Sequence, residues 1–135
     1  MIRLYTDEPT VGATDGTEIS SGGDMTRPIT FGPLNASTNE VSASKKVAIR
    51  TDPGYKTASS TTITPIGVRA NRWQLAPDDD GVPGVFEEYG AGLVIAQEIV
   101  DENTIFWIRT RSIDTESARE DSLARIEVST QVEMV

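Results

Sequence analysis

Alternation of apolar and polar side chains is the strongest pattern in this chain, and it is clearest near the C-terminus. From residue 122 to residue 134 the even positions are apolar or nearly so, and most residues between them are polar. This period of two predicts a β-strand with one face in solvent. The expected partner is segment 104–111, which starts with four bulky residues in its first five and then alternates, as in a strand covered on both faces at one end. We therefore expect these two segments to pair.

Shorter segments of the same character precede these two. They cover residues 2–6, 45–50, 61–64, 72–76, 86–89 and 92–100. Val47 and Ile49 are expected to point inward, and Trp73 and Leu75 to share a face. Pro65 places the end of its strand at an edge or a bulge, because proline donates no ladder hydrogen bond. Strands at these spacings, with the tight turn that Asp52-Pro53-Gly54 predicts, are typical of an all-β sandwich or barrel.

The chain divides by composition into a loop-rich N-terminal segment, 1–44, and a β-sandwich core, 45–135, within a single domain. Gly, Ser, Thr, Asn, Asp and Pro dominate the first segment, which also offers brief strands at 2–6 and 28–31. It is either an extended arm or a pair of long loops folded against the sandwich. Residues 77–84 are expected to form a loop, and residues 115–123 either one or two helical turns or a solvated loop.

The composition removes most catalytic chemistry. The 135 residues include no cysteine and no histidine, so disulfides, thiolate metal sites and the commonest general base are all absent. The hydroxyl-rich run 57–62 has no base to activate a nucleophile, and the acidic clusters lie at predicted strand ends. We therefore expect a protein that is not an enzyme and binds no cofactor.

Charge and hydropathy limit the classes of partner that we expect for this chain. The chain has 21 acidic and 12 basic residues, for a net charge of −9, which repels phosphate backbones and argues against nucleic acid as a partner. No apolar run approaches the roughly 20 residues that span a bilayer, and residues 1–8 lack the apolar core of a signal peptide. We expect synthesis in the cytosol and no membrane association.

One acidic run invites a metal interpretation. Asp78, Asp79 and Asp80 precede Gly81, and calcium favours several oxygen ligands on a tight loop. The spacing does not match an EF-hand, because Glu87 follows too early. A solvated turn is therefore the preferred interpretation, and these three residues stay weak metal candidates.

Two groups of larger side chains are candidates for binding. Arg109, Arg111 and Arg125 lie on the last two predicted strands and would share a face if those strands pair. Such a face suits a cross-strand charge ladder or an arginine-rich protein interface. Trp73 and Trp107 are candidates either for the core or for an exposed binding platform.

Segments 89–93, 103–111 and 121–126 give the chain a resemblance to small virion proteins of tailed bacteriophages and prophages. The similar region runs from Lys45 to Met134. The resemblance implies an immunoglobulin-like antiparallel β-sandwich of about six to eight strands, which decorates or joins parts of the head or tail. It also implies that residues 1–44 act like the extended arms that virion proteins use to reach a neighbour. The cysteine pair of antibody-type domains is absent.

The leading hypothesis is a non-enzymatic structural or assembly protein of a phage particle. It would be made in the bacterial cytoplasm, end in the virion, and bind other virion proteins or copies of itself, as a homo-oligomer or on a capsid or tail lattice. The interface candidates are Ile2, Leu4, Tyr5, Phe31, Arg109, Arg111 and Arg125. The alternative is a monomeric β-sandwich binding module for a glycan or a surface protein, with loop 77–84 and Trp73 or Trp107 as its platform.

Overall fold

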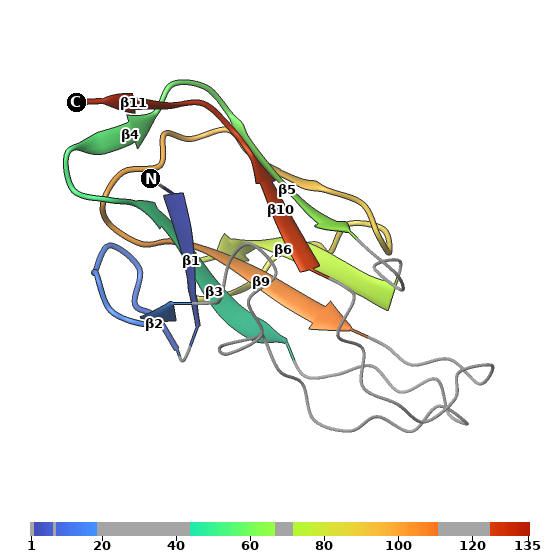
Figure 1. The fold of residues 1–135 in the computed structure, drawn as a ribbon. Helices are drawn as coiled ribbons and strands as arrows, with labels where there is room; N and C mark the ends of the chain where they lie inside the picture. Colours follow the sequence, from blue (N-terminus) through green and yellow to red (C-terminus); the bar gives the residue numbers. More distant parts are fainter. Residues whose placement is uncertain (1, 7, 19–43, 67–71, 111–124) are drawn as a thin grey trace, which may run out of the picture.

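The structure is a computed structural model that describes residues 2–6, 8–18, 44–66, 72–110 and 125–135, and these residues form β-sheets (Figure 1). The strands in chain order are β1 (Ile2–Thr6), β2 (Thr17–Glu18), β3 (Lys45–Thr51), β4 (Tyr55–Thr57), β5 (Thr61–Ile66), β6 (Trp73–Asp79), β7 (Val82–Pro83), β8 (Leu93–Ile95), β9 (Thr104–Thr110), β10 (Arg125–Ser129) and β11 (Val132–Met134). The predicted strand at 28–31 and the predicted helical turns at 115–123 lie outside the described residues. None of the described segments is a helix long and apolar enough to cross a membrane.

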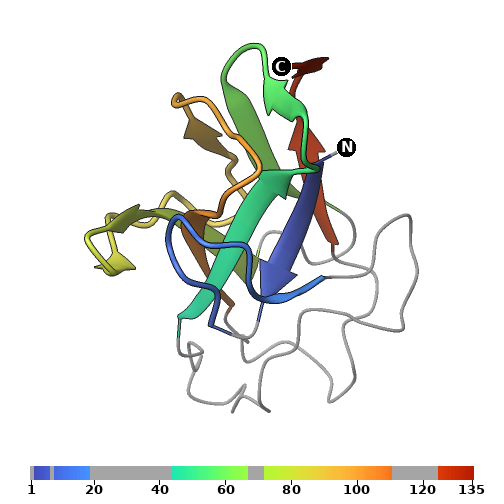
Figure 2. The ribbon, with the colours of Figure 1, turned by 90° about the vertical axis from the view of Figure 1, so that its left-hand side faces the viewer.

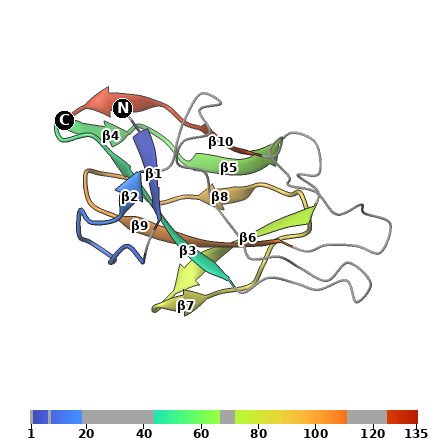
Figure 3. The same cartoon turned by 60° about the horizontal axis from the view of Figure 1, so that its bottom comes forward.

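The strands make two facing layers and a small third sheet. The larger layer has the order β2-β1-β3-β9-β6-β7, the second layer has β10-β5-β8, and β11 pairs with β4. Figure 3 shows β10, β5 and β8 lying over the large sheet, and every pairing is antiparallel. The predicted all-β, sandwich-like fold is therefore confirmed.

The core lies between the two layers and draws side chains from both. Its buried members are Val47, Ile49, Ile63, Trp73, Leu75, Leu93, Ile95, Ile99, Phe106 and Ile108. Phe106 on β9 is fully buried, and β9 is a central strand between β3 and β6. The inward direction predicted for Val47 and Ile49, and the shared face of Trp73 and Leu75, are confirmed.

Two local predictions about β3 and β5 also hold. The N–H of Tyr55 donates to the carbonyl of Asp52 at 3.2 Å, which closes the turn predicted from Asp52-Pro53-Gly54. Pro65 pairs with Ile126 of β10, whereas β8 pairs only with the first three residues of β5. Pro65 therefore lies past the end of β8, where a missing N–H leaves no gap in that ladder.

The predicted long strand at 122–134 is wrong in two ways. Within the described residues it is two strands in two different sheets, with β10 on β5 and β11 on β4. Neither pairs with β9, because β3 and β6 already occupy both edges of that strand. The break falls at Thr130, whose hydroxyl oxygen accepts a hydrogen bond from Thr61 at 2.9 Å. Met134, one of the apolar even positions of the predicted strand, is 76% exposed.

The predicted loop at 77–84 is mostly a β-hairpin. Asp79 of β6 pairs with Val82 of β7, which leaves Asp80 and Gly81 as a two-residue turn. Both turn residues have positive φ, 54° and 91°, as a type I′ turn requires, and Asp-Gly is a preferred sequence for it. The loop prediction was wrong because the acidic run masked this hairpin signal.

The strands predicted at 86–89 and 92–100 are also corrected. Segment 86–89 is not a strand, although the N–H of Glu87 donates to the carbonyl of Leu75 at 2.8 Å. Only β8 remains of the second segment. Ile99 lies beyond the end of β8 and makes two hydrogen bonds with Thr57. The N–H of Thr57 donates to the carbonyl of Ile99, and the N–H of Ile99 donates to the hydroxyl of Thr57, each at 2.9 Å.

Candidate functional site

The outer face of the large sheet, away from the core, holds the half-buried Trp107 on β9. Its indole N–H donates to Asp78 Oδ1 at 2.9 Å. Ala76 lies directly opposite Trp107 on β6 and is fully buried, and Asp78 is two residues further along that strand. Side chains two residues apart share a face of a strand. The indole therefore lies across Ala76 and is held in place by the carboxylate.

Arg109 occupies the next outward position on β9. Its Nε donates to Gln74 Oε1 at 2.8 Å, and its guanidinium lies over the ring of Phe86 at 3.9 Å. Gln74 in turn donates from Nε2 to the carbonyl of Glu87 at 3.0 Å. The stacking and the hydrogen bond both restrict the guanidinium. The positive charge of Arg109 is therefore held in a fixed position beside Trp107.

The two tryptophans have opposite roles. Trp73 is 7% exposed and belongs to the core, so its alternative role as a binding platform is wrong. Trp107 is the more exposed of the two tryptophans. It lies beside the β6–β7 hairpin, the segment that was predicted to be a loop.

The weak metal candidates lie on the β6–β7 hairpin, with Asp78 and Asp79 at the end of β6 and Asp80 in the turn. Asp78 holds the indole of Trp107 and accepts a longer bond, 3.4 Å, from the N–H of Gly81. Asp79 and Asp80 are exposed. Across the described parts of the chain, no three acidic side chains come together in a group that would hold a metal ion.

A second polar cluster surrounds Asn103, which is 4% exposed and stands just before β9. Its Nδ2 donates to the carbonyl of Thr10 at 3.0 Å and to Asp15 Oδ1 at 2.9 Å. Its Oδ1 accepts a hydrogen bond from Arg50 Nη1 at 2.7 Å, and the Arg50 guanidinium lies 3.5 Å from the centre of the Tyr5 ring. We name these five residues the Asn103 clamp. Local sequence patterns indicated only a turn at Asn103, because its partners are up to 93 residues away.

The carboxylate of Asp15 is also held in position by Thr10. The backbone N–H and the hydroxyl of Thr10 both donate to its carboxylate, each at 2.8 Å. These bonds, led by the one from the Thr10 backbone, hold the pKa of the Asp15 carboxyl below its ordinary value. The clamp therefore contains a stable anion next to the Arg50 cation.

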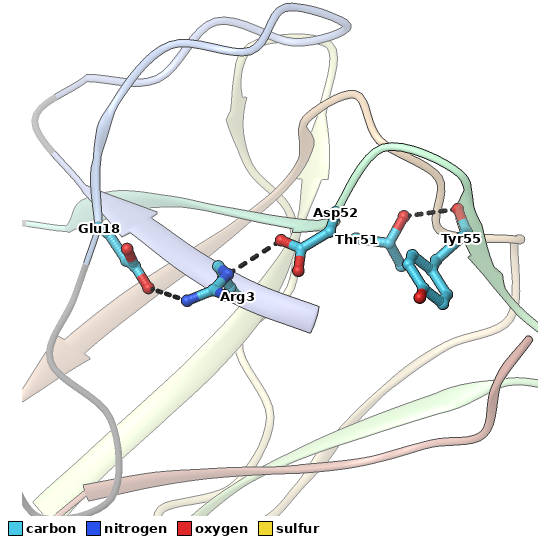
Figure 4. A network of polar contacts seen from close by, with 5 residues as sticks. All are labelled: Arg3, Glu18, Thr51, Asp52 and Tyr55. Carbon is cyan, nitrogen blue, oxygen red and sulfur yellow. Dashed lines mark hydrogen bonds and ion pairs between the residues drawn. The ribbon is translucent and has the colours of Figure 1, made fainter. Parts of the chain in front are cut away.

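An exposed ion-pair group ties the N-terminal strand to its neighbours (Figure 4). Arg3 of β1 donates from Nε to Asp52 Oδ1 at 2.9 Å and from Nη1 to Glu18 Oε1 at 2.7 Å. The hydrogen bond from Arg3 lowers the pKa of Asp52 to about 2. Beside it, the hydroxyl of Thr51 donates to the carbonyl of Tyr55 at 2.8 Å.

The interface candidates of the N-terminal segment lie in the sheet. Ile2 and Leu4 of β1 pack against the core, and Tyr5 lies beneath Arg50. β1 stands between β2 and β3 in the large sheet. The strand predicted at 2–6 is thus confirmed, and it belongs to the large sheet. Phe31 lies outside the described residues.

The arginine candidates are not brought together. Arg109 belongs to β9 of the large sheet, whereas Arg125 opens β10 opposite Ile66, in the other layer. The shared face expected for them is therefore wrong, because the two strands do not pair. The side chain of Arg125 and the whole of Arg111 lie outside the description.

Exposed apolar side chains gather near the β6–β7 hairpin. Val82 is 58% and Val85 is 86% exposed. Figure 2 shows this hairpin extending away from the two layers.

Comparison of the chain with protein-family models, curated proteins and solved structures finds no match.

Proposed function

We propose that this chain is a non-enzymatic structural or assembly protein of a phage or prophage particle, acting through protein–protein interfaces. Its partners are other virion proteins or copies of itself, and its sandwich is of the immunoglobulin-like kind. The supporting observation is the β6–β7 hairpin, which extends away from the two layers, with Val82 on β7 58% exposed and Val85, two residues after β7, 86% exposed. Contiguous exposed apolar surface marks interaction sites, and these two valines are three positions apart in the chain.

The hairpin suits this role because it is already ordered. β6 is anchored to β9 over five residue pairs, from Trp73 to Pro77, and the Asp80-Gly81 turn closes the hairpin in a favoured conformation. When a partner covers Val82 and Val85, little conformational entropy is lost in ordering the chain. Most of the free energy of the apolar contact then contributes to affinity.

Light scattering across a concentration series tests self-association. We expect a defined oligomer for the full chain and a smaller mass for the double variant Val82→Ser/Val85→Ser. Val94→Ser is the matched control, because Val94 is 60% exposed but lies on β8 of the other layer. Equal masses for the double variant and the full chain would remove the hairpin from the interface.

Mass spectrometry of particles induced from the encoding bacterium tests the virion assignment directly. We expect peptides of this chain in the purified particles. Particles that lack the polypeptide would refute the assignment, whatever the mass of the isolated protein.

A further inference from the structure

The outer face around Trp107 offers an aromatic ring with one side already supported. The indole lies across the buried Ala76, and its N–H is engaged by Asp78 at 2.9 Å. The ring therefore needs no reorientation before it can stack with a ligand. Trp107 is half-buried, so part of this side chain is open to solvent.

Polar groups of both signs border this ring. Lys46 of β3 lies directly across from Trp107, opposite Ala76, and Arg109 follows two residues along β9. Arg109 uses Nε on Gln74, and within the described part of the chain its terminal nitrogens are left as donors. Asp78 contributes carboxylate oxygens on the β6 side. The ring is thus flanked by donors and by an acceptor.

We propose that this face binds a neutral saccharide, with one pyranose ring stacked on Trp107 and its hydroxyls hydrogen-bonded to Asp78 and Arg109. The apolar C–H face of a pyranose matches an indole, and its hydroxyls both donate and accept. The charges select against other ligands. Lys46 and Arg109 repel cations, while the net charge of −9 disfavours polyanions. The site is separate from the valines of the assembly proposal and does not depend on it.

A glycan array with the labelled full chain tests the site. It carries neutral gluco-, galacto-, manno- and xylo-oligosaccharides next to sialylated and sulfated ones. We expect binding to neutral spots, weakened about tenfold or more by Trp107→Ala, since a stacking contact of about 1.4 kcal/mol corresponds to that factor. Trp107→Phe retains a ring without the bond to Asp78 and is expected to bind with intermediate affinity.

Val94→Ala is the matched control for the array, because Val94 is an exposed apolar residue on β8 of the other layer and its truncation should leave binding unchanged. Thermal unfolding verifies that each variant is folded. If Trp107→Ala does not fold, Arg109→Gln replaces it, with the same expected loss. Binding to no spot, binding to charged glycans alone, or full binding by the folded variant would each overturn the proposal.

Discussion

Replacing Asn103 with alanine removes the amide at the centre of the Asn103 clamp. The side chain is 4% exposed and makes hydrogen bonds of 3.0 Å to the Thr10 carbonyl, 2.9 Å to Asp15 Oδ1 and 2.7 Å from Arg50. A weaker bond of 3.3 Å reaches the Asp15 carbonyl. Water cannot easily replace these partners at a site that is almost closed to solvent. The variant therefore leaves several polar groups without their bonds.

The size of the effect follows from those bonds. A net hydrogen bond contributes about 1 kcal/mol, and more when one partner is charged, as Arg50 is. We expect Asn103→Ala to lower the free energy of unfolding by about 2–4 kcal/mol. For a chain of 135 residues, each kcal/mol shifts the melting temperature by about 3.5 °C. The expected decrease is then about 7–14 °C.

Urea unfolding followed by tryptophan fluorescence measures this loss, since Trp73 is in the core. Glu102→Ala is the matched control, because Glu102 is the exposed neighbour of Asn103, and its change should stay within about 0.5 kcal/mol. If Asn103→Ala is destabilised by no more than this control, the hydrogen bonds of the Asn103 clamp do not stabilise the fold.

Two further predictions concern the N-terminal strand and its surroundings. Arg3 lowers the pKa of Asp52 to about 2, so its contribution to stability is present above the ordinary pKa and is lost as pH falls from about 4 to 2. Chemical unfolding should accordingly show Asp52→Asn less stable than the unaltered chain at pH 6, with the difference shrinking as pH falls through the folded-state pKa of about 2. A difference that stays the same over this range would contradict the prediction. Gly16→Ala should destabilise more than Gly54→Ala, although both have positive φ, because the added Cβ would lie 2.9 Å from Tyr5 Cβ at Gly16 and meets nothing within 4 Å at Gly54. Equal melting temperatures would show that the contact at Gly16 relaxes freely.

The sequence predicted best where a strand lies between two others and is buried. β3 and β9 carry apolar residues on the core face and are paired along both edges, so their composition follows directly from their environment. Val47, Ile49 and Phe106 are all fully buried. Burial leaves a strong imprint on composition, and this is why the all-β class could be inferred from one sequence.

The sequence predicted worst where a choice of partner decides the structure. The alternation of residues 122–134 is compatible with any partner strand, and it did not reveal that β10 and β11 belong to different sheets. By contrast, Asp80-Gly81 was a usable hairpin signal that the acidic run obscured.

The candidate site was predictable only in part. Trp107 and Arg109 were named from their position on one strand, but Ala76 and Gln74, which support them, became visible only through the β6–β9 register. Asn103 was still harder to find, because its role rests on bonds that cross 53 to 93 residues.

The long reach of the Asn103 clamp has a consequence for biosynthesis. Residues 10 to 15 are translated well before Asn103, and the bond from Asn103 to Asp15 spans 88 residues. At about 5–20 residues per second, the ribosome needs about 4–18 s to make that interval. During this time β1 and the segment after it lack the hydrogen bonds from Asn103, although β3 is made part-way through the interval. β1 is therefore made well before the Asn103 clamp can form, and its apolar side chains Ile2 and Leu4 stay accessible to chaperones at least until β3 can pair with it.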